Sequence, residues 1–525
     1  MWDPFGVGAF FENLSQLTGI QIDQITFITV QITALTIAPT FQSLLHPSKA
    51  SPALRQIVSL VLGVIFASTC FGRQLLHLFF LSTVSYVLFK TVNPLRVQWI
   101  TLIVTLSYLS LMHLYRLFFE YASYSLDITG PLMVAVQKLT SLAFILHDNI
   151  HIKKNVSDSN NHIKKNGSES NNHIKKNGSE NNNLMKKNGS ESNKVTCKIT
   201  TVPSLLEFYG YMFNFQTLMV GPLVFFDDHM EWVNGENFTK HKLQANGSST
   251  KNGSVPSPFQ AVLKKVTASA AFGLLYVSLI SKFPISKLRD DDFVEKWSLL
   301  SQILYLHIST TLVRFMYYNA WLLTDAVCNA SGLGFNGYDE HGVSRWDLVT
   351  NVNIPKFEFG VNFKETIDGW NMGTNRWLRL IVYNRTKKFS TALTFALSAL
   401  WHGFYPGYYL TFANGALFIS AARAVRRKIR PYFQSSSSHK LFYDLATTVV
   451  SRVAMAYIVF PFVLLEFGLS MRIYLHQYFW MHILAISAVF LLPHFPSSGP
   501  EAQTFAARLT LTQSSNNLVT TSIHG

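Results

Sequence analysis

Long apolar stretches that return along the whole chain constrain its fold more than any other feature. Segments of about 20 residues, long enough to cross a hydrocarbon core of roughly 30 Å, recur between residues 25 and 493. Only 14% of the 525 residues are charged, whereas an ordinary soluble domain has about 25%. A water-soluble enzyme is therefore excluded, and the chain is predicted to be an all-α, polytopic membrane protein, because lipid-embedded helices satisfy their own backbone hydrogen bonds.

The apolar stretches predict roughly ten or eleven membrane helices. They lie at about 25–45, 56–71, 74–92, 97–119, 130–147, 204–226, 260–281, 298–325, 389–401, 408–422, 445–469 and 472–493. Lys49 and Arg55 follow the first stretch, which predicts a cytosolic loop there and a lumenal N-terminus. Because residues 1–48 contain no Lys or Arg, we expect no cleavable signal peptide with a basic start.

The net charge of +15 is interpreted as membrane topology, with positive loops kept in the cytosol. A nucleic-acid partner would need clustered basic and aromatic residues on a soluble fold, so none is expected. The three cysteines, Cys70, Cys197 and Cys328, form no CxxC pair and have no nearby His at a zinc-ligand spacing. We therefore expect neither a disulfide framework nor a metal.

Residues 151–194 form a low-complexity array with a period of 11 residues. Its first unit begins with HIKKN at His151, and its last unit begins with LMKKN at Leu184. Each unit has too few apolar residues to bury a core. We therefore expect a disordered cytosolic loop that interrupts a membrane domain over residues 1–495, and we attribute its Asn-Gly-Ser sequons to composition. A second polar loop is expected over 233–257, and the tail 496–525 is expected to be disordered.

Polar residues at membrane depth are costly and therefore mark functional candidates. For the lone histidines His77, His113 and His307 we favour a structural, hydrogen-bonded interpretation. His402 is different, because Gly403, Pro406 and Gly407 separate two apolar stretches beside it.

These two stretches, 389–401 and 408–422, are about 20 Å long each at 1.5 Å per residue, too short to span the bilayer. Basic residues flank both outer ends, so the pair is predicted to be a hairpin that enters from the cytosol and returns to it. Its apex would lie at bilayer depth, where non-helical backbone is tolerated only along a protein cavity. A histidine there can accept a proton from a substrate.

Asn371 is the predicted partner of His402. The residues between them include Arg376, Arg379, Arg385, Lys387 and Lys388 but no Asp or Glu. Such a run suits an anionic ligand from the cytosol, for example the phosphates of coenzyme A or a phospholipid head group. An ordinary basic cytosolic flank is the alternative.

These residues resemble those of the membrane-bound O-acyltransferase family, and within it the lysophospholipid acyltransferases of the lysophosphatidylethanolamine and lysophosphatidylserine type. The resemblance rests on Trp370-Asn371, on the WHGxxxGYxxxF pattern from Trp401 to Phe412, on YxxxxF from Tyr457 to Phe462, and on YxxxYFxxH from Tyr474 to His482. It covers about residues 20–495, and the array at 151–194 is an insertion relative to the family.

The resemblance implies that the helices surround an internal catalytic chamber, with His402 as the catalytic histidine and Asn371 as its partner. The further substrate-binding residues that it implies are Trp401, Gly403, Gly407, Tyr408, Phe412, Tyr474 and His482. It also implies a multi-pass protein of the endoplasmic reticulum membrane, with acyl-CoA and a lysophospholipid as substrates and with no bound cofactor or metal.

The implied reaction transfers a fatty acyl group from acyl-CoA to the free glycerol hydroxyl of a lysophospholipid. An amine-bearing head group and a monounsaturated donor are expected, with lysophosphatidylcholine as a further acceptor. The alternatives are acylation of lysophosphatidylinositol, diacylglycerol, a sterol or a protein, or a transporter with a midplane histidine as proton relay. A transporter usually has repeats with paired broken helices, and the sequence has no second WHG hairpin. The oligomeric state is left open.

Overall fold

The computed structural model describes residues 8–18, 20–121, 126–166, 201–240 and 256–494. Within these ranges the chain forms helices and no β-strand, apart from one isolated bridge between Tyr338 and Ser344. The predicted all-α class is thus confirmed. The expected tail at 496–525 lies outside the described residues, as does most of the array.

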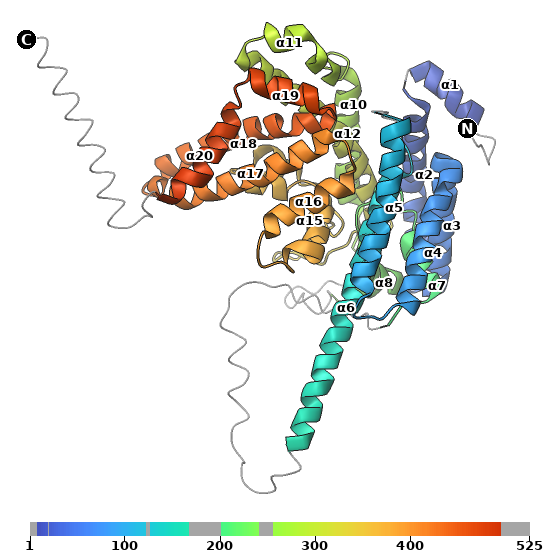
Figure 1. The fold of residues 1–525 in the computed structure, drawn as a ribbon. Coiled ribbons are helices and arrows are strands. Elements are labelled where there is room, and N and C mark those ends of the chain that lie inside the picture. The colour runs from blue at the N-terminus through green and yellow to red at the C-terminus, as the bar shows by residue number, and fades with distance from the viewer. Residues whose placement is uncertain (1–7, 19, 122–125, 167–200, 241–255, 495–525) are drawn as a thin grey trace, which may run out of the picture.

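The longer helices carry most of the architecture. They are α2 (Ile22–Leu44), α3 (Pro52–Phe71), α4 (Leu75–Thr91), α5 (Val97–Phe119), α6 (Thr129–Asn166), α10 (Phe259–Leu279), α12 (Leu299–Ala330), α16 (Ser390–His402), α17 (Pro406–Lys428), α18 (Ser437–Leu464), α19 (Phe467–His476) and α20 (Trp480–Leu491). Figure 1 shows α2 to α5 grouped at one side of the molecule and α16 to α20 at the other.

Shorter helices fill the connections. They are α1 (Gly8–Thr18), α7 (Leu205–Met212), α8 (Phe226–Asn234), α9 (Glu236–Thr239), α11 (Asp291–Glu295), α13 (Ile354–Phe359), α14 (Phe363–Asp368) and α15 (Met372–Leu378). A π-helical turn, η3 (Arg379–Tyr383), follows α15, and a short helix, η4 (Arg430–Phe433), follows α17.

Six helical segments of the described chain are long and apolar enough to cross a membrane, or seven if α19 and α20, bent by 81° at their junction, form one span. This supports a multi-pass protein but is fewer than the ten or eleven expected spans. One reason is that α3 and α4 run on as a single apolar segment of 40 residues. Another is that α16 has only 13 residues, too few to span alone.

In two regions that were expected to be loops, the structure has helix near the start. The array was expected to be a loop throughout, but α6 continues to Asn166 (Figure 1). In the second polar stretch, residues Glu236–Thr239 form α9. Asn237, the acceptor of a sequon, is buried there, and its side-chain amide donates to the Gly332 carbonyl at 3.1 Å. The prediction of an unbroken loop over 233–257 is therefore wrong.

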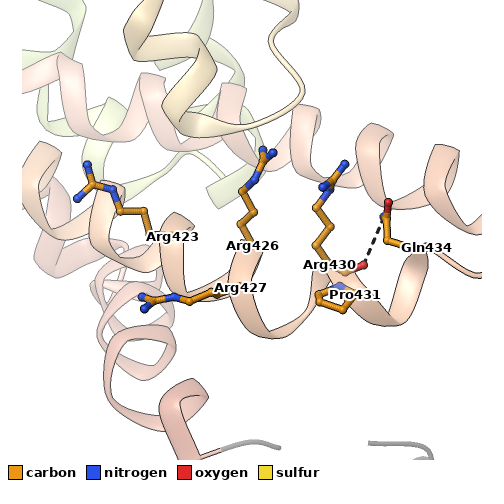
Figure 2. Close-up of a pocket in the computed structure, with 6 residues that line it drawn as sticks. All are labelled: Arg423, Arg426, Arg427, Arg430, Pro431 and Gln434. Carbon is orange, nitrogen blue, oxygen red and sulfur yellow. Dashed lines mark hydrogen bonds between the residues drawn. The ribbon is translucent and has the colours of Figure 1, made fainter. Parts of the chain in front are cut away.

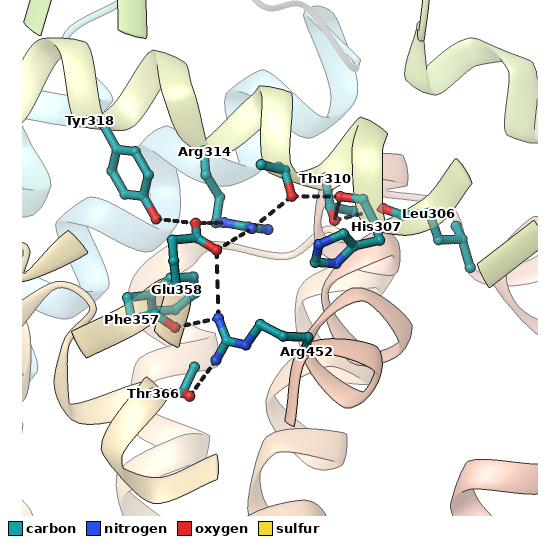
Figure 3. Close-up of polar contacts among 10 residues, drawn as sticks. Leu306, His307, Thr310, Arg314, Tyr318, Phe357, Glu358, Thr366 and Arg452 are labelled. Atoms are coloured by element: carbon teal, nitrogen blue, oxygen red, sulfur yellow. Dashed lines mark hydrogen bonds and ion pairs between the residues drawn. The ribbon is translucent and has the colours of Figure 1, made fainter. Parts of the chain in front are cut away.

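An ion network around the buried Arg314 ties α12, α13 and α18 together (Figure 3). Arg314 of α12 donates to both carboxylate oxygens of Glu358 on α13, at 3.0 Å each. The Tyr318 hydroxyl donates to the same carboxylate at 2.6 Å, and Arg452 of α18 lies 3.5 Å from it. Arg452 also donates to the Phe357 carbonyl. One carboxylate thus serves two guanidinium groups from different helices.

Removing that carboxylate should destabilise the fold. We expect Glu358→Ala to lower the free energy of unfolding by roughly 3–5 kcal/mol, because it leaves the buried Arg314 and the partly buried Arg452 guanidinium groups without their carboxylate partner. Thermal unfolding of the detergent-purified full chain measures the effect. Glu340→Ala is the control, since the Glu340 side chain is 87% exposed. Equal melting temperatures for the two variants would contradict the structural importance of the network.

Candidate active site

A cavity of about 730 Å³ opens between the N-terminal and C-terminal groups of helices. Its walls come from α5, α6, α12, the α13–α15 segment, α16, α17 and α18, and they are mainly apolar. Apolar clefts with few convergent polar groups are the usual form of small-molecule sites. The cavity therefore suits a ligand with a long hydrocarbon portion.

His402 stands at a break between two helices of this wall. It is the last residue of α16, and Gly403 next to it has φ 115°, a conformation that side chains rarely adopt. Pro406 then begins α17, so a helix break lies where it was predicted, but α17 runs to Lys428 rather than 422 and, with 23 residues, is longer than the hairpin prediction assumed. The break leaves the His402 side chain at the cavity.

Aromatic rings hold the His402 imidazole. It stacks on Phe412 with ring centroids 5.1 Å apart and meets the Phe462 ring edge-on at the same separation. Within the described chain, neither imidazole nitrogen has a hydrogen-bond partner. The ring is thus fixed by packing while its nitrogens are free for a ligand.

Two contacts from the N-terminal helices anchor this break. His113 of α5 donates from Nε2 to the Trp401 carbonyl at 3.2 Å. The Trp401 indole in turn donates to the Met133 carbonyl of α6 at 3.0 Å. A Cβ at Gly403 would lie 3.0 Å from the His113 ring. The hydrogen-bonded interpretation of His113 is correct, and the structure adds that His113 lines the cavity too.

Asn371 reaches the same cavity from a different segment. Its backbone is left-handed, with φ 44°, directly before α15. The amide groups that follow are held by Asn351: Met372 N–H donates to the Asn351 carbonyl at 2.7 Å and Gly373 N–H to the Asn351 side chain at 2.9 Å. The Asn371 side chain has no hydrogen-bond partner among the described residues. The two predicted site residues therefore face one cavity.

The other motif residues fall into two groups. Trp401, Tyr408 and Phe412 line the cavity beside His402. Tyr474 and His482 do not; they lie behind the cavity wall in a hydrogen-bonded chain with Tyr457 and Asn414. His482 donates from Nε2 to Asn414 Oδ1 at 3.0 Å, so its Nδ1 accepts from the Tyr457 hydroxyl at 2.8 Å. Asn414 then donates to the Tyr474 hydroxyl at 2.9 Å. This places Tyr474 and His482 in structural support of α17.

The basic run between Asn371 and His402 is less free than its sequence indicates. Arg385 pairs with Asp148 of α6 at 2.5 Å, and Arg379 lies 3.8 Å from Asp368. Arg376 donates to the Leu348 carbonyl. These carboxylates belong to residues outside the run. The pairing therefore cannot be predicted from the sequence of the run alone.

Gly407 has a packing role that its sequence motif did not reveal. Its N–H donates to the Leu465 carbonyl at 3.1 Å, and a Cβ there would lie 2.0 Å from the Pro461 carbonyl oxygen. The start of α17 therefore touches the end of α18 backbone to backbone. Gly407 is not among the residues that line the cavity.

We expect Gly407→Ala to destabilise the protein by about 1–3 kcal/mol, because the added methyl group forces two backbones apart. Melting temperature and the monodisperse yield in detergent measure this. Gly468→Ala is the matched control, since a Cβ at Gly468 meets no atom within 4 Å. A Gly407→Ala variant of normal stability with weakened substrate binding would instead favour a ligand-binding role.

Comparisons with known proteins identify the family of the chain. Residues 187–471 match the model of the membrane-bound O-acyltransferase family. The chain is 41% identical over 498 residues to lysophospholipid acyltransferase 6 of Drosophila melanogaster, covering 94% of this chain but only 64% of that protein. It is 36% identical over 486 residues to membrane-bound glycerophospholipid O-acyltransferase 1 of Mus musculus, covering 92% of each chain.

Proposed function

The chain belongs to the membrane-bound O-acyltransferase family, and on this premise we propose that it transfers a fatty acyl group from acyl-CoA to the free glycerol hydroxyl of a lysophospholipid. The observation that carries the proposal is the His402 imidazole, whose nitrogens have no partner among the described residues, in a cavity that also receives Asn371. The names of the relatives, lysophospholipid acyltransferase and glycerophospholipid O-acyltransferase, support the acceptor class. The endoplasmic reticulum membrane is the proposed location.

His402 is the proposed general base. A lipid hydroxyl is a poor nucleophile, so a base must take its proton as its oxygen attacks the thioester carbonyl carbon. An imidazole is suited to this because it can hold and release a proton near neutral pH. When the tetrahedral intermediate collapses, the carbon–sulfur bond breaks and the imidazolium returns the proton to the thiolate. The products are the diacyl phospholipid and free coenzyme A.

Asn371 is the proposed donor to the oxyanion. Its side-chain amide has no hydrogen-bond partner among the described residues, so its N–H groups are available to the negative charge that develops on the thioester oxygen. A fixed donor of this kind commonly contributes about 10²–10³-fold to the rate. The aromatic rings around His402 keep water from the thioester, which water would hydrolyse. No metal or bound cofactor takes part in the proposed reaction.

The mechanism is tested by removing the two side chains. We expect His402→Ala to lower turnover by at least roughly 10²–10⁴-fold and Asn371→Ala by about 10²–10³-fold. Both are assayed on the purified full chain with oleoyl-CoA and lysophosphatidylethanolamine. His77→Ala is the control, because His77 is a half-buried histidine that bonds Tyr108 at 2.7 Å and lies outside the cavity wall. Near-normal turnover in a folded His402→Ala variant would overturn the mechanism.

The proposed acceptor carries an amine-bearing head group. A charged head is costly to draw into an apolar chamber, so it should stay at the interface while the glycerol hydroxyl reaches His402. With equal lysolipid concentrations and a monounsaturated donor, we expect lysophosphatidylethanolamine or lysophosphatidylserine to be used first and lysophosphatidylcholine less well. Tenfold better use of lysophosphatidylinositol or diacylglycerol would refute the head-group proposal and leave the His402 mechanism intact.

A further inference from the structure

The end of α5 carries three polar side chains that follow one another along a single helix face. They are His113, Arg116 and Glu120, at positions i, i+3 and i+7. His113 and Arg116 line the cavity. His113 is buried, whereas the Arg116 side chain is 19% exposed and the Glu120 side chain 40%. The series therefore leads from the cavity to the surface of the molecule.

Contacts place this part of the chain beside the helix break at His402. His113 is bonded to the Trp401 carbonyl. Eight residues farther along the chain, the Tyr121 ring meets the Tyr405 ring edge-on, with ring centroids 5.4 Å apart, and Tyr405 lines the cavity. The last turns of α5 and the residues directly after them thus run along the residues that flank His402.

The charges at the end of α5 are of both signs. Arg116 lies 3.1 Å from Asp127 and 3.8 Å from Glu120. Asp127 also accepts from the Thr129 hydroxyl at 2.6 Å and from the Thr129 N–H at 3.2 Å, so the start of α6 fixes this carboxylate and, through it, Arg116. One guanidinium group and two carboxylates leave one negative charge over. The cluster can therefore attract a cation while it still offers a guanidinium group to an anion.

A second charged hollow of the molecule differs from this cluster because its charges have one sign. It is a pocket of about 720 Å³ at the end of α17, lined by Arg423, Arg426, Arg427, Arg430, Pro431 and Gln434 (Figure 2). No carboxylate is among these lining residues, so an ammonium group would be repelled there. A ligand group that carries both charges is better matched by the cluster at the end of α5.

The spacing of the cluster matches a phospholipid head group. When the free hydroxyl is on the middle glycerol carbon, four bonds separate its oxygen from phosphorus, and four more separate phosphorus from an ethanolamine nitrogen. Each step spans roughly 5 Å, at the 3.5 Å per three bonds of an extended chain. Along α5, Arg116 lies about 4.5 Å beyond His113 and Glu120 about 6 Å beyond Arg116, at 1.5 Å per residue. With the hydroxyl at His402, the phosphate comes level with Arg116 and the amine with Glu120.

We propose that Arg116 binds the phosphate of the acceptor and Glu120 its ammonium group, while Asp127 is a positioning residue that holds Arg116 in place. This rests on the proposed acyltransferase function and assigns the residues that select the head group. A zwitterionic head fits the cluster because each of its charges meets a group of the opposite sign. A neutral glycerolipid has neither charge and gains nothing there.

Glu120→Gln tests the amine contact, because it keeps the size of the side chain and removes its charge. The purified full chain is assayed in phosphatidylcholine nanodiscs with oleoyl-CoA. The two acceptors are lysophosphatidylethanolamine and lysophosphatidylglycerol, which share the phosphate but differ in the amine. We expect the KM for lysophosphatidylethanolamine to rise about 3–10-fold, as for one partly exposed ion pair. The KM for lysophosphatidylglycerol should stay unchanged.

Asp292→Asn is the matched control for Glu120→Gln. The Asp292 side chain is 61% exposed, pairs at 2.7 Å with Lys296 four residues away, and lies outside the cavity wall. Both KM values of this variant should equal those of the wild type. An equal rise for both acceptors in Glu120→Gln, or no rise for either, would overturn the amine contact.

Arg116→Gln tests the phosphate contact. We expect the KM for both lysophospholipids to rise about 10–100-fold, as for lost charge-assisted hydrogen bonds. Monooleoylglycerol has free hydroxyls but no phosphate, so variant and wild type should use it alike. Unchanged KM values would overturn the role of Arg116, as would an equal loss with all three acceptors and a lowered melting temperature, since Arg116 would then only stabilise the fold. Absence of wild-type transfer to any lysophospholipid would refute the proposed function itself.

Discussion

The helix break from His402 to Pro406 is the constraint on which the rest of the structure depends. Away from water an unpaired backbone group costs several kcal/mol, so such a break needs partners from elsewhere in the chain. The structure supplies them: Gly403 N–H returns to the Ala399 carbonyl, Gly407 N–H reaches the Leu465 carbonyl, and the Trp401 carbonyl accepts from His113. The backbone groups at the break are thus paired, while the His402 nitrogens have no hydrogen-bond partner among the described residues.

On the opposite wall of the cavity, ion pairs between side chains hold the chain in place. Asn371 lies in the turn between α14 and α15. The carboxylate of Glu358 joins the α13–α15 segment to α12 and α18 through two arginines. The Asn353 N–H donates to the Gly369 carbonyl at 2.9 Å and closes the segment on itself. The left-handed turn at Asn371 is therefore held on both sides.

Much of this could be predicted from sequence where local chemistry decides the outcome. The all-α class, the helix break beside His402 and the choice of His402 and Asn371 as candidates came from apolar length, helix-breaking residues and a specific motif. Pairings between distant segments could not be predicted in this way. Asp148 neutralises Arg385 across the fold, and Tyr474 and His482 support a helix rather than line the cavity.

The backbone contact between Gly407 and Pro461 also governs how the chamber can open. With no side chain between them, α17 and α18 have no compressible layer at this point, and interlocked backbones move together rather than apart. The two helices should behave as one rigid arm that carries Phe412, Phe462 and the stacked imidazole with it. Room for a bulky lipid is then expected from the segments on the other sides of the cavity, which bear Asn371 and His113.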